Sequence, residues 1–181
     1  MRWDRLFAEL EAEALDLAAA DRDVEIADRT RAELGRIRWA DRVRAAAGGR
    51  VRVWLASGDL VEGEVGRVGG DWLLLDGDRH DVLVPVHGVV GIEGVGPASA
   101  SAVGAVALTW SAAWRVLARD RAQVRVTRTA GGTVHGVPVR VGADFVELGT
   151  QRVEGTAGHG QGSVLVPYAA ITAAYVPRQP D

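Results

Sequence analysis

The stretch VRVWLASGDLVEGEVGRVGGDWLLL, residues 51–75, returns 73 positions later as VRVTRTAGGTVHGVPVRVGADFVEL, residues 124–148. Eleven of the 25 aligned positions are identical, and no gap is needed. After a slip of nine residues the match resumes, because VLVP occurs at residues 82–85 and again at residues 164–167. An internal repeat of this length predicts two copies of one structural unit, one after the other in the chain.

Each copy has the pattern of short antiparallel strands. Apolar side chains alternate with others at Val51, Val53 and Leu55, as in a strand with one buried face, and Gly58 lies in the turn that follows. Further strands of the first copy are expected at residues 60–68, 72–75, 81–84 and 89–93.

The repeat also extends backward, since Ala40 matches Ala113 and Val43 matches Val116, so each copy is expected to begin with a helix. One helix and five short strands within about 55 residues favour a small, strongly bent barrel. The expected fold class is mainly β with helices: two tandem five-stranded barrels, each preceded by a helix, after an amphipathic N-terminal helical arm. In chain order the expected domains are the arm 1–34, a barrel 35–95, a linker 96–106, and a barrel 107–177 with a glycine-rich loop insertion at 149–162.

The order of elements resembles a known fold. A helix, five strands, the pattern V-x-V-x-L-x-x-G-x-x-V-x-G-x-V-x-x-V-G-x-D-x-L-x-L and the closing V-L-V-P-x-x-x-V are similar to the Sm-like (LSm/Hfq) family, whose members are SH3-like barrels. The resemblance covers residues 35–95 and 105–177. It implies barrels that associate edge to edge, so that the two barrels of this chain either pair internally or build a pseudo-symmetric ring.

The RNA-contacting residues of that family are only partly present. Asp71 and Asp144 match the family's aspartate, but leucine takes the place of the asparagine that follows it, and the chain contains no asparagine. Of the second family motif, an Arg-Gly or a Lys-His, only His87 and Gly88 remain. His87 is either a nucleotide contact or an exposed loop histidine, and we favour the second interpretation. We interpret Asp71 and Asp144 as structural turn residues whose side chains bond to turn amides.

The N-terminal arm has an apolar stripe at helical spacing that we interpret as a candidate oligomer face, formed by Trp3, Leu6, Phe7, Leu10 and Leu17. This stripe either pairs with a second copy as a coiled coil or lies on the chain's own barrels. Thr30 and Glu33 have the spacing of a capping box, so the arm is either one continuous helix or two.

Charge divides sharply along the first 54 residues. Residues 1–28 hold three arginines and nine acids, whereas residues 29–54 hold eight arginines and two acids. Arginine binds phosphates in a bidentate manner, so the second segment, with His87, is a candidate nucleic-acid or partner contact; the alternative is an ordinary solvated face. The arginines concerned are Arg29, Arg31, Arg36, Arg38, Arg42, Arg44, Arg50 and Arg52.

The composition argues against an enzyme. All 21 basic residues are arginine, which excludes a Schiff-base lysine, and the absence of cysteine excludes a thiol nucleophile and a disulfide framework. The four histidines lack metal-binding spacing, and the glycine-rich residues 158–162 precede no helix that would bind a phosphate. We therefore expect no catalytic residue, no cofactor, no metal and no small-molecule substrate.

The first residues lack the apolar run of a signal peptide, which predicts a cytoplasmic protein. The uncharged residues 94–114 are weakly hydrophobic, and we interpret them as a linker that leads into a short helix and not as a membrane span. The formal net charge of −3 provides no general attraction to nucleic acid or to a membrane.

Together these features predict a non-enzymatic assembly or scaffolding module whose partner is a second copy or another protein. The alternative is an RNA- or DNA-binding regulatory protein that uses residues 29–54. A third hypothesis is a module that binds an extended peptide along an exposed barrel edge.

Overall fold

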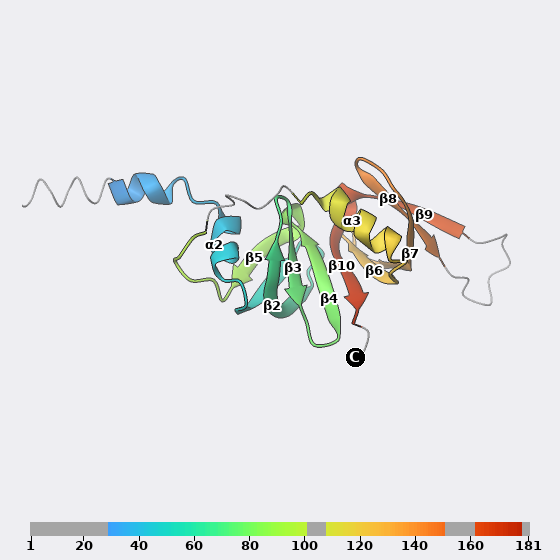
Figure 1. Cartoon of the computed structure of the whole chain (residues 1–181), viewed down its shortest axis with the longest axis horizontal. Coiled ribbons are helices and arrows are strands. Elements are labelled where there is room, and N and C mark those ends of the chain that lie inside the picture. The colour runs from blue at the N-terminus through green and yellow to red at the C-terminus, as the bar shows by residue number, and fades with distance from the viewer. Residues whose placement is uncertain (1–28, 101–107, 151–161, 179–181) are drawn as a thin grey trace, which may run out of the picture. The chain divides into compact units, whose positions relative to one another are not determined.

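The computed structural model describes residues 29–100, 108–150 and 162–178, and the chain divides into two compact units, residues 1–38 and 39–181 (Figure 1). In the first unit, residues 29–34 are helical. The helix ends in a turn in which the amide of Gly35 donates to the carbonyl of Arg31 at 3.0 Å and that of Arg36 to Glu33 at 3.0 Å.

The second unit is built mainly from strands. In chain order its elements are α2 (Trp39–Ala45), β1 (Arg50–Leu55), β2 (Leu60–Val68), β3 (Trp72–Asp76), β4 (His80–Pro85), the 3-10 helix η1 (Val86–Gly88), β5 (Val89–Glu93), α3 (Trp110–Arg119), β6 (Val124–Arg128), β7 (Thr133–Val141), β8 (Phe145–Thr150), β9 (Gly162–Pro167), the 3-10 helix η2 (Tyr168–Ala170) and β10 (Ile171–Pro177). The predicted fold class, mainly β with helices, is confirmed at this level.

The ten strands form one antiparallel sheet in the order β5-β1-β2-β3-β4-β10-β6-β7-β8-β9. The first five strands of the chain occupy one half of this order and the last five occupy the other. The two halves meet where β4 pairs with β10, a junction that we call the seam (Figure 1). Among the described residues, β5 and β9 are the two edge strands of the sheet.

The two halves have the same internal register. Val53 lies opposite Ile92 in the first half, and the repeat-related Val126 lies opposite Ala174 in the second. Each long strand, β2 and β7, contains a bulge at the same repeat position, between Val65 and Arg67 and between Pro138 and Arg140. A bulge bends a strand and increases its twist, which lets one long strand curve around its own half.

Each half has its own hydrophobic core. The first contains the alternating apolar residues of β1, including Val53 and Leu55, and the second contains Val126 and Leu148. Strand β10 contributes to both, since Ala173 packs in the first core and Ala174 in the second. Because successive side chains of a strand point to opposite faces, the strand at the seam joins the two cores.

The two helices that the repeat aligns do not bury equivalent residues. Val43 of α2 is buried in the first core, but the aligned Val116 of α3 is 46% exposed. In α3 the buried positions are Trp110 and Trp114, which lie one turn apart on the same face. The large indole rings therefore decide which face of α3 turns inward, and the sequence repeat of the helices does not extend to their packing.

Helix α3 begins at Trp110, and the Thr109 side chain caps it by accepting a hydrogen bond from the amide of Ala112 at 3.2 Å. The helix therefore lies at the end of the uncharged run, as the sequence predicted. No helix within the described residues is long and apolar enough to cross a membrane.

Candidate assembly surfaces at the two ends of the sheet

The seam shows how one half recognises the other through backbone pairing. In the seam Leu83 lies opposite Ala174 and Val82 opposite Tyr175, and the antiparallel pairing continues for two more residues. Leu83 projects from the outer face of the first half into the second core and is 7% exposed. The seam therefore combines strand pairing with burial of an outer-face side chain.

Hydrogen bonds that involve side chains add to the backbone pairing at the seam. The Trp72 indole donates from Nε1 to the carbonyl of Leu108 at 2.8 Å, and the amide of Trp110 donates to Asp71 Oδ1 at 2.9 Å. A carboxylate at a helix N-terminus accepts a hydrogen bond from an otherwise unpaired amide, and its negative charge interacts favourably with the positive end of the helix dipole. The beginning of α3 is thereby tied to the turn between β2 and β3.

The 3-10 helix η1 completes the seam. His87 Nε2 lies 3.0 Å from the carbonyl oxygen of Ile171, within hydrogen-bonding distance. Gly88 is buried against β10, and a Cβ added to it would meet the carbonyl oxygen of Thr172 at 2.8 Å. Glycine at this position therefore allows the two backbones to approach closely.

At one end of the sheet, which we call the β5 end, α2 and β5 enclose a hollow. Its volume is about 310 Å³. Val90 is 67% exposed, and Trp39 is also exposed, although both side chains are apolar. The residues that line the hollow are Trp39, Arg42, Val43, Val89, Val90, Gly91, Ile92 and Val95. The β5 end thus presents an apolar surface next to an unpaired strand edge, a combination that invites a further strand.

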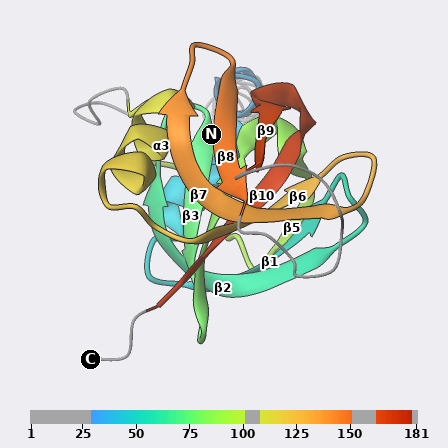
Figure 2. The same ribbon diagram turned by 90° about the vertical axis from the view of Figure 1, so that its right-hand side faces the viewer.

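The opposite end, which we call the β9 end, is formed by β8 and β9 with part of β7; Figure 2 views the sheet from this side. Leu165 is 56% exposed, and Val139 of β7 is similarly open. Glu147 accepts hydrogen bonds from Ser163 and Arg140, so its charge is partnered. This end also offers a strand edge together with apolar side chains.

The arginines that the sequence marked as candidate contacts are divided between the two units. Four of them, Arg29, Arg31, Arg36 and Arg38, belong to the first unit, and Arg42, Arg44, Arg50 and Arg52 belong to the second. In the second unit, Arg42 donates from Nε and Nη2 to the carbonyl of Gly96 at 3.0 and 2.8 Å.

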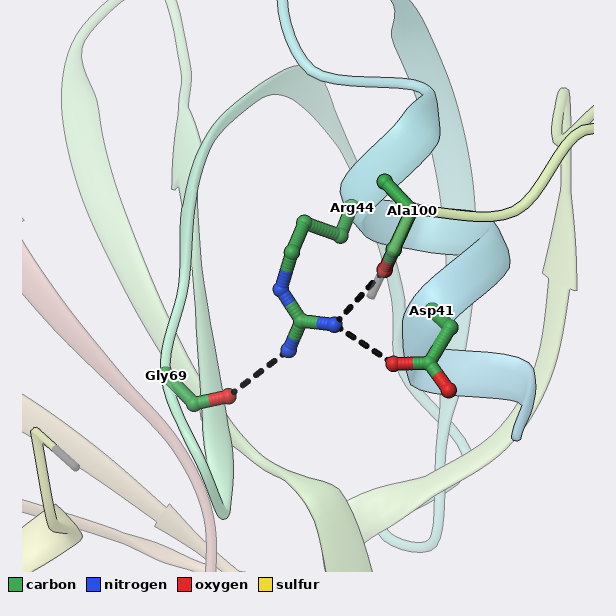
Figure 3. Close-up of polar contacts among 4 residues, drawn as sticks. All are labelled: Asp41, Arg44, Gly69 and Ala100. Atoms are coloured by element: carbon green, nitrogen blue, oxygen red, sulfur yellow. Dashed lines mark hydrogen bonds and ion pairs between the residues drawn. The ribbon is translucent and has the colours of Figure 1, made fainter. Parts of the chain in front are cut away.

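Arg44 holds α2 to the rest of the first half (Figure 3). Its Nη1 donates to Asp41 Oδ1 at 2.6 Å and to the carbonyl of Ala100 at 3.1 Å, and its Nη2 donates to Gly69 at 3.4 Å. Arg52 lies between Glu62, at 2.9 Å, and Glu93, at 3.3 Å. These guanidinium groups therefore have partners within the fold, while Arg50 is an exposed residue of β1.

A cavity of about 650 Å³ lies beside the seam and brings together Asp71, His87 and Tyr168. Burial raises the pKa of Tyr168 to about 12, an effect that nearby Arg115 reduces. The Tyr168 hydroxyl donates to the carbonyl of Gly142 at 3.3 Å. One carboxylate oxygen of Asp71, Oδ1, accepts a hydrogen bond from the amide of Trp110.

The two predicted turn aspartates have different contacts. The Asp71 carboxylate bonds outside its own turn, to α3, and its carbonyl accepts from Val86 at 2.8 Å. Asp144 accepts from Tyr168 through its carbonyl at 2.7 Å, and its side chain makes no hydrogen bond in the part of the chain that the structure describes. The repeat preserves the backbone contact, but only Asp71 has a helix start beside it.

The predicted oligomer face, Trp3, Leu6, Phe7, Leu10 and Leu17, lies outside the described residues. Within the described ranges, no group of three His, Asp or Glu side chains could hold a metal ion. Sequence reasoning missed the exposed Val90 and Leu165 at the sheet ends. The repeat itself carried the signal that could have found them. When β4 of the first copy pairs with β10 of the second, the repeat counterparts of these strands, β9 and β5, are left at the ends of the sheet.

No protein-family model matches this chain, and no curated protein matches it either.

Proposed function

We propose that this protein is a non-enzymatic assembly module made of two tandem Sm-like barrels. Three features support the barrel assignment: the strand order within each half, the matching register of the two halves, and the bulge in each long strand. Each half also has its own core, as two barrels require. A cytoplasmic location is part of the same proposal.

The assembly role rests on one observation above the others. The seam joins β4 to β10 inside the chain, and this leaves β5 and β9, the repeat counterparts of β10 and β4, at the two ends of the sheet. Edge strands present unpaired backbone groups, and natural proteins usually protect them with charge, proline or a covering element. Here Val90 and Leu165 place apolar side chains on or beside those edges.

The nucleic-acid alternative has weaker support in the described residues. The guanidinium groups of Arg42, Arg44 and Arg52 are engaged by backbone carbonyls or carboxylates, so binding phosphate would require breaking those contacts. An extended peptide could also bind along the strand edge at the β5 end. However, the β9 end has an edge strand with exposed apolar side chains too, and two such ends favour assembly over a single peptide site.

The test is the mass of the full chain in solution, measured by sedimentation velocity over a wide concentration range. We expect reversible growth beyond the monomer, and we expect Leu165→Glu to prevent it by placing a charge on the β9 end. Leu60→Glu is the matched control, because Leu60 is also an exposed strand leucine but lies on β2, an inner strand that pairs with β1 and β3. A strict monomer at every concentration would refute the proposed function.

A further inference from the structure

The outer surface of β3 and β4 forms a groove with one side of α3, which we call the α3 groove. Its volume is about 500 Å³, and small-molecule sites typically have roughly 300–1,000 Å³. Strands of the first half and the helix of the second half both contribute to it, so the groove lies across the seam. We infer that the α3 groove binds an amphiphilic carboxylic acid, with the carboxylate at Arg67 and the apolar chain along the groove. This inference is independent of the assembly role.

The floor of the α3 groove is apolar and continuous with the second core. Trp72 and Leu83 belong to that core, and Leu74 of β3 and Val176 of β10 pack against it while they remain partly exposed. On the helix side of the groove, Val116 is 46% exposed. Removing this apolar surface from water is favourable, so the groove suits the hydrocarbon part of a ligand.

Arg67 lines the groove from the end of β2 and provides a cation for the head group. Within the described residues its guanidinium group makes no hydrogen bond or ion pair. In the pairing of β2 with β3, Arg67 lies opposite Leu74. An anion bound to this guanidinium group would therefore lie directly beside the apolar floor, as the two parts of an amphiphilic acid require.

The second half shows which partner Arg67 lacks. Arg140 is the repeat counterpart of Arg67, and it lies opposite Glu147 in the pairing of β7 with β8. Arg140 Nη1 is 3.5 Å from Glu147 Oε2, and the hydroxyl of Ser163 donates to Oε1 of the same carboxylate. The residue that corresponds to Glu147 in the first half is Leu74. The first half thus keeps the arginine without its carboxylate, and the carboxylate of a ligand would restore the ion pair.

The acidic side chains at the groove have a cation of their own. Asp76 and Asp81 line the α3 groove together with Arg67. Arg178 binds both of these carboxylates, with Nη2 3.5 Å from Asp76 Oδ1 and Nε 2.5 Å from Asp81 Oδ1. Of the three charged lining residues, Arg67 is therefore the one that lacks an oppositely charged partner. This difference favours an anionic head group over a cationic one.

Isothermal titration calorimetry of the full chain with sodium decanoate tests the inference. We expect saturable binding, and we expect Arg67→Gln to weaken it by about fivefold, the upper range for an exposed ion pair. Arg140→Gln is the matched control, because Arg140 has the same repeat position but already pairs with Glu147. This control should leave decanoate binding unchanged. Both arginines are exposed, so neither variant removes a side chain from a core.

Two further ligands separate the hydrocarbon chain from the head group. Hexanoate should bind at least about tenfold more weakly than decanoate, because it covers less of the apolar floor. Decyltrimethylammonium has the same chain with a positive head group, and it should bind at least about fivefold more weakly, because it cannot pair with Arg67. Leu74→Glu places the carboxylate of the second half beside Arg67 and should abolish decanoate binding.

Three results would overturn the inference. Decanoate that does not bind, or that binds equally to Arg67→Gln and to the wild type, would remove the carboxylate site. Equal affinities for hexanoate and decanoate would mean that Arg67 attracts any carboxylate and that the groove takes no part. Tighter binding of decyltrimethylammonium would assign the groove to cations through Asp76 and Asp81. None of these results depends on the mass of the chain in solution, which tests the assembly role separately.

Discussion

Leu83 and Leu165 form a matched pair for measuring what the seam contributes, because they are the same residue at the same repeat position. Replacing Leu83 by alanine removes three carbon atoms from a side chain that is 7% exposed. At about 0.8 kcal/mol for each buried methylene, the lost transfer energy is about 2.4 kcal/mol, and the cavity left between the halves adds to it. We expect the free energy of unfolding to fall by about 2–4 kcal/mol.

Leu165→Ala at low protein concentration is expected to cost less than about 0.5 kcal/mol, because the side chain is largely exposed in the single chain. The measurement is urea unfolding followed by tryptophan fluorescence, with both variants and the wild type at the same dilute concentration. At concentrations where the wild type assembles, the deficit of Leu165→Ala should grow, since assembly stabilises only the folded state. Equal losses for the two variants in dilute solution would refute the reasoning.

Three further predictions concern single contacts. Thr109→Ala should destabilise the fold by about 1 kcal/mol, because it removes the cap of α3, and thermal unfolding measures the loss. Arg44→Ala should cost about 1.5–3 kcal/mol, since the partly buried Asp41 carboxylate and the carbonyls that Arg44 binds lose their charged donor. The half-exposed Arg52→Ala should cost less than about 1 kcal/mol in the same urea assay. Burial raises the pKa of Tyr168 from the usual 10.0 to about 12 in the folded state. The unfolded chain therefore loses this proton first, so the contribution of Tyr168 to the free energy of unfolding is complete below about pH 10 and declines as the pH rises from about 10 to about 12. An ultraviolet titration should lose its highest-pH step in Tyr168→Phe, and an unchanged titration curve would contradict the assignment.

The sequence was sufficient for the organisation of each half. Alternation at Val51, Val53 and Leu55 predicted β1, and the repeat predicted that the second half would follow the same order of elements. These features are local or repeat at a fixed spacing, so they can be read without knowing any long-range contact. The helix expected before each set of strands is present, but the repeat did not show which residues it buries: Val43 is buried in α2, and Trp110 and Trp114 are buried in α3.

The partners of the arginines could not be read from the sequence either. Residues 29–54 are strongly basic as a string, but Arg44 lies near Asp41, Gly69 and Ala100, and the last two are far from it in the chain. Likewise, the sequence around Asp71 is that of an ordinary turn aspartate, and it does not show that the carboxylate binds the first amide of α3. A charge pattern gives the number of cations in a segment, whereas their availability depends on which carbonyl groups the tertiary structure brings within reach.

The sequence by itself determined that two similar halves exist, how many strands each contains and which face of each strand is apolar. Only the tertiary structure decided that β4 joins β10, and therefore that β5 and β9 remain at the ends. The physical reason is that backbone amide and carbonyl groups are alike in every strand, so local pattern does not specify which edges meet. Leu83 and Leu165 have the same local pattern, and only the neighbour across the strand edge makes one of them part of a core.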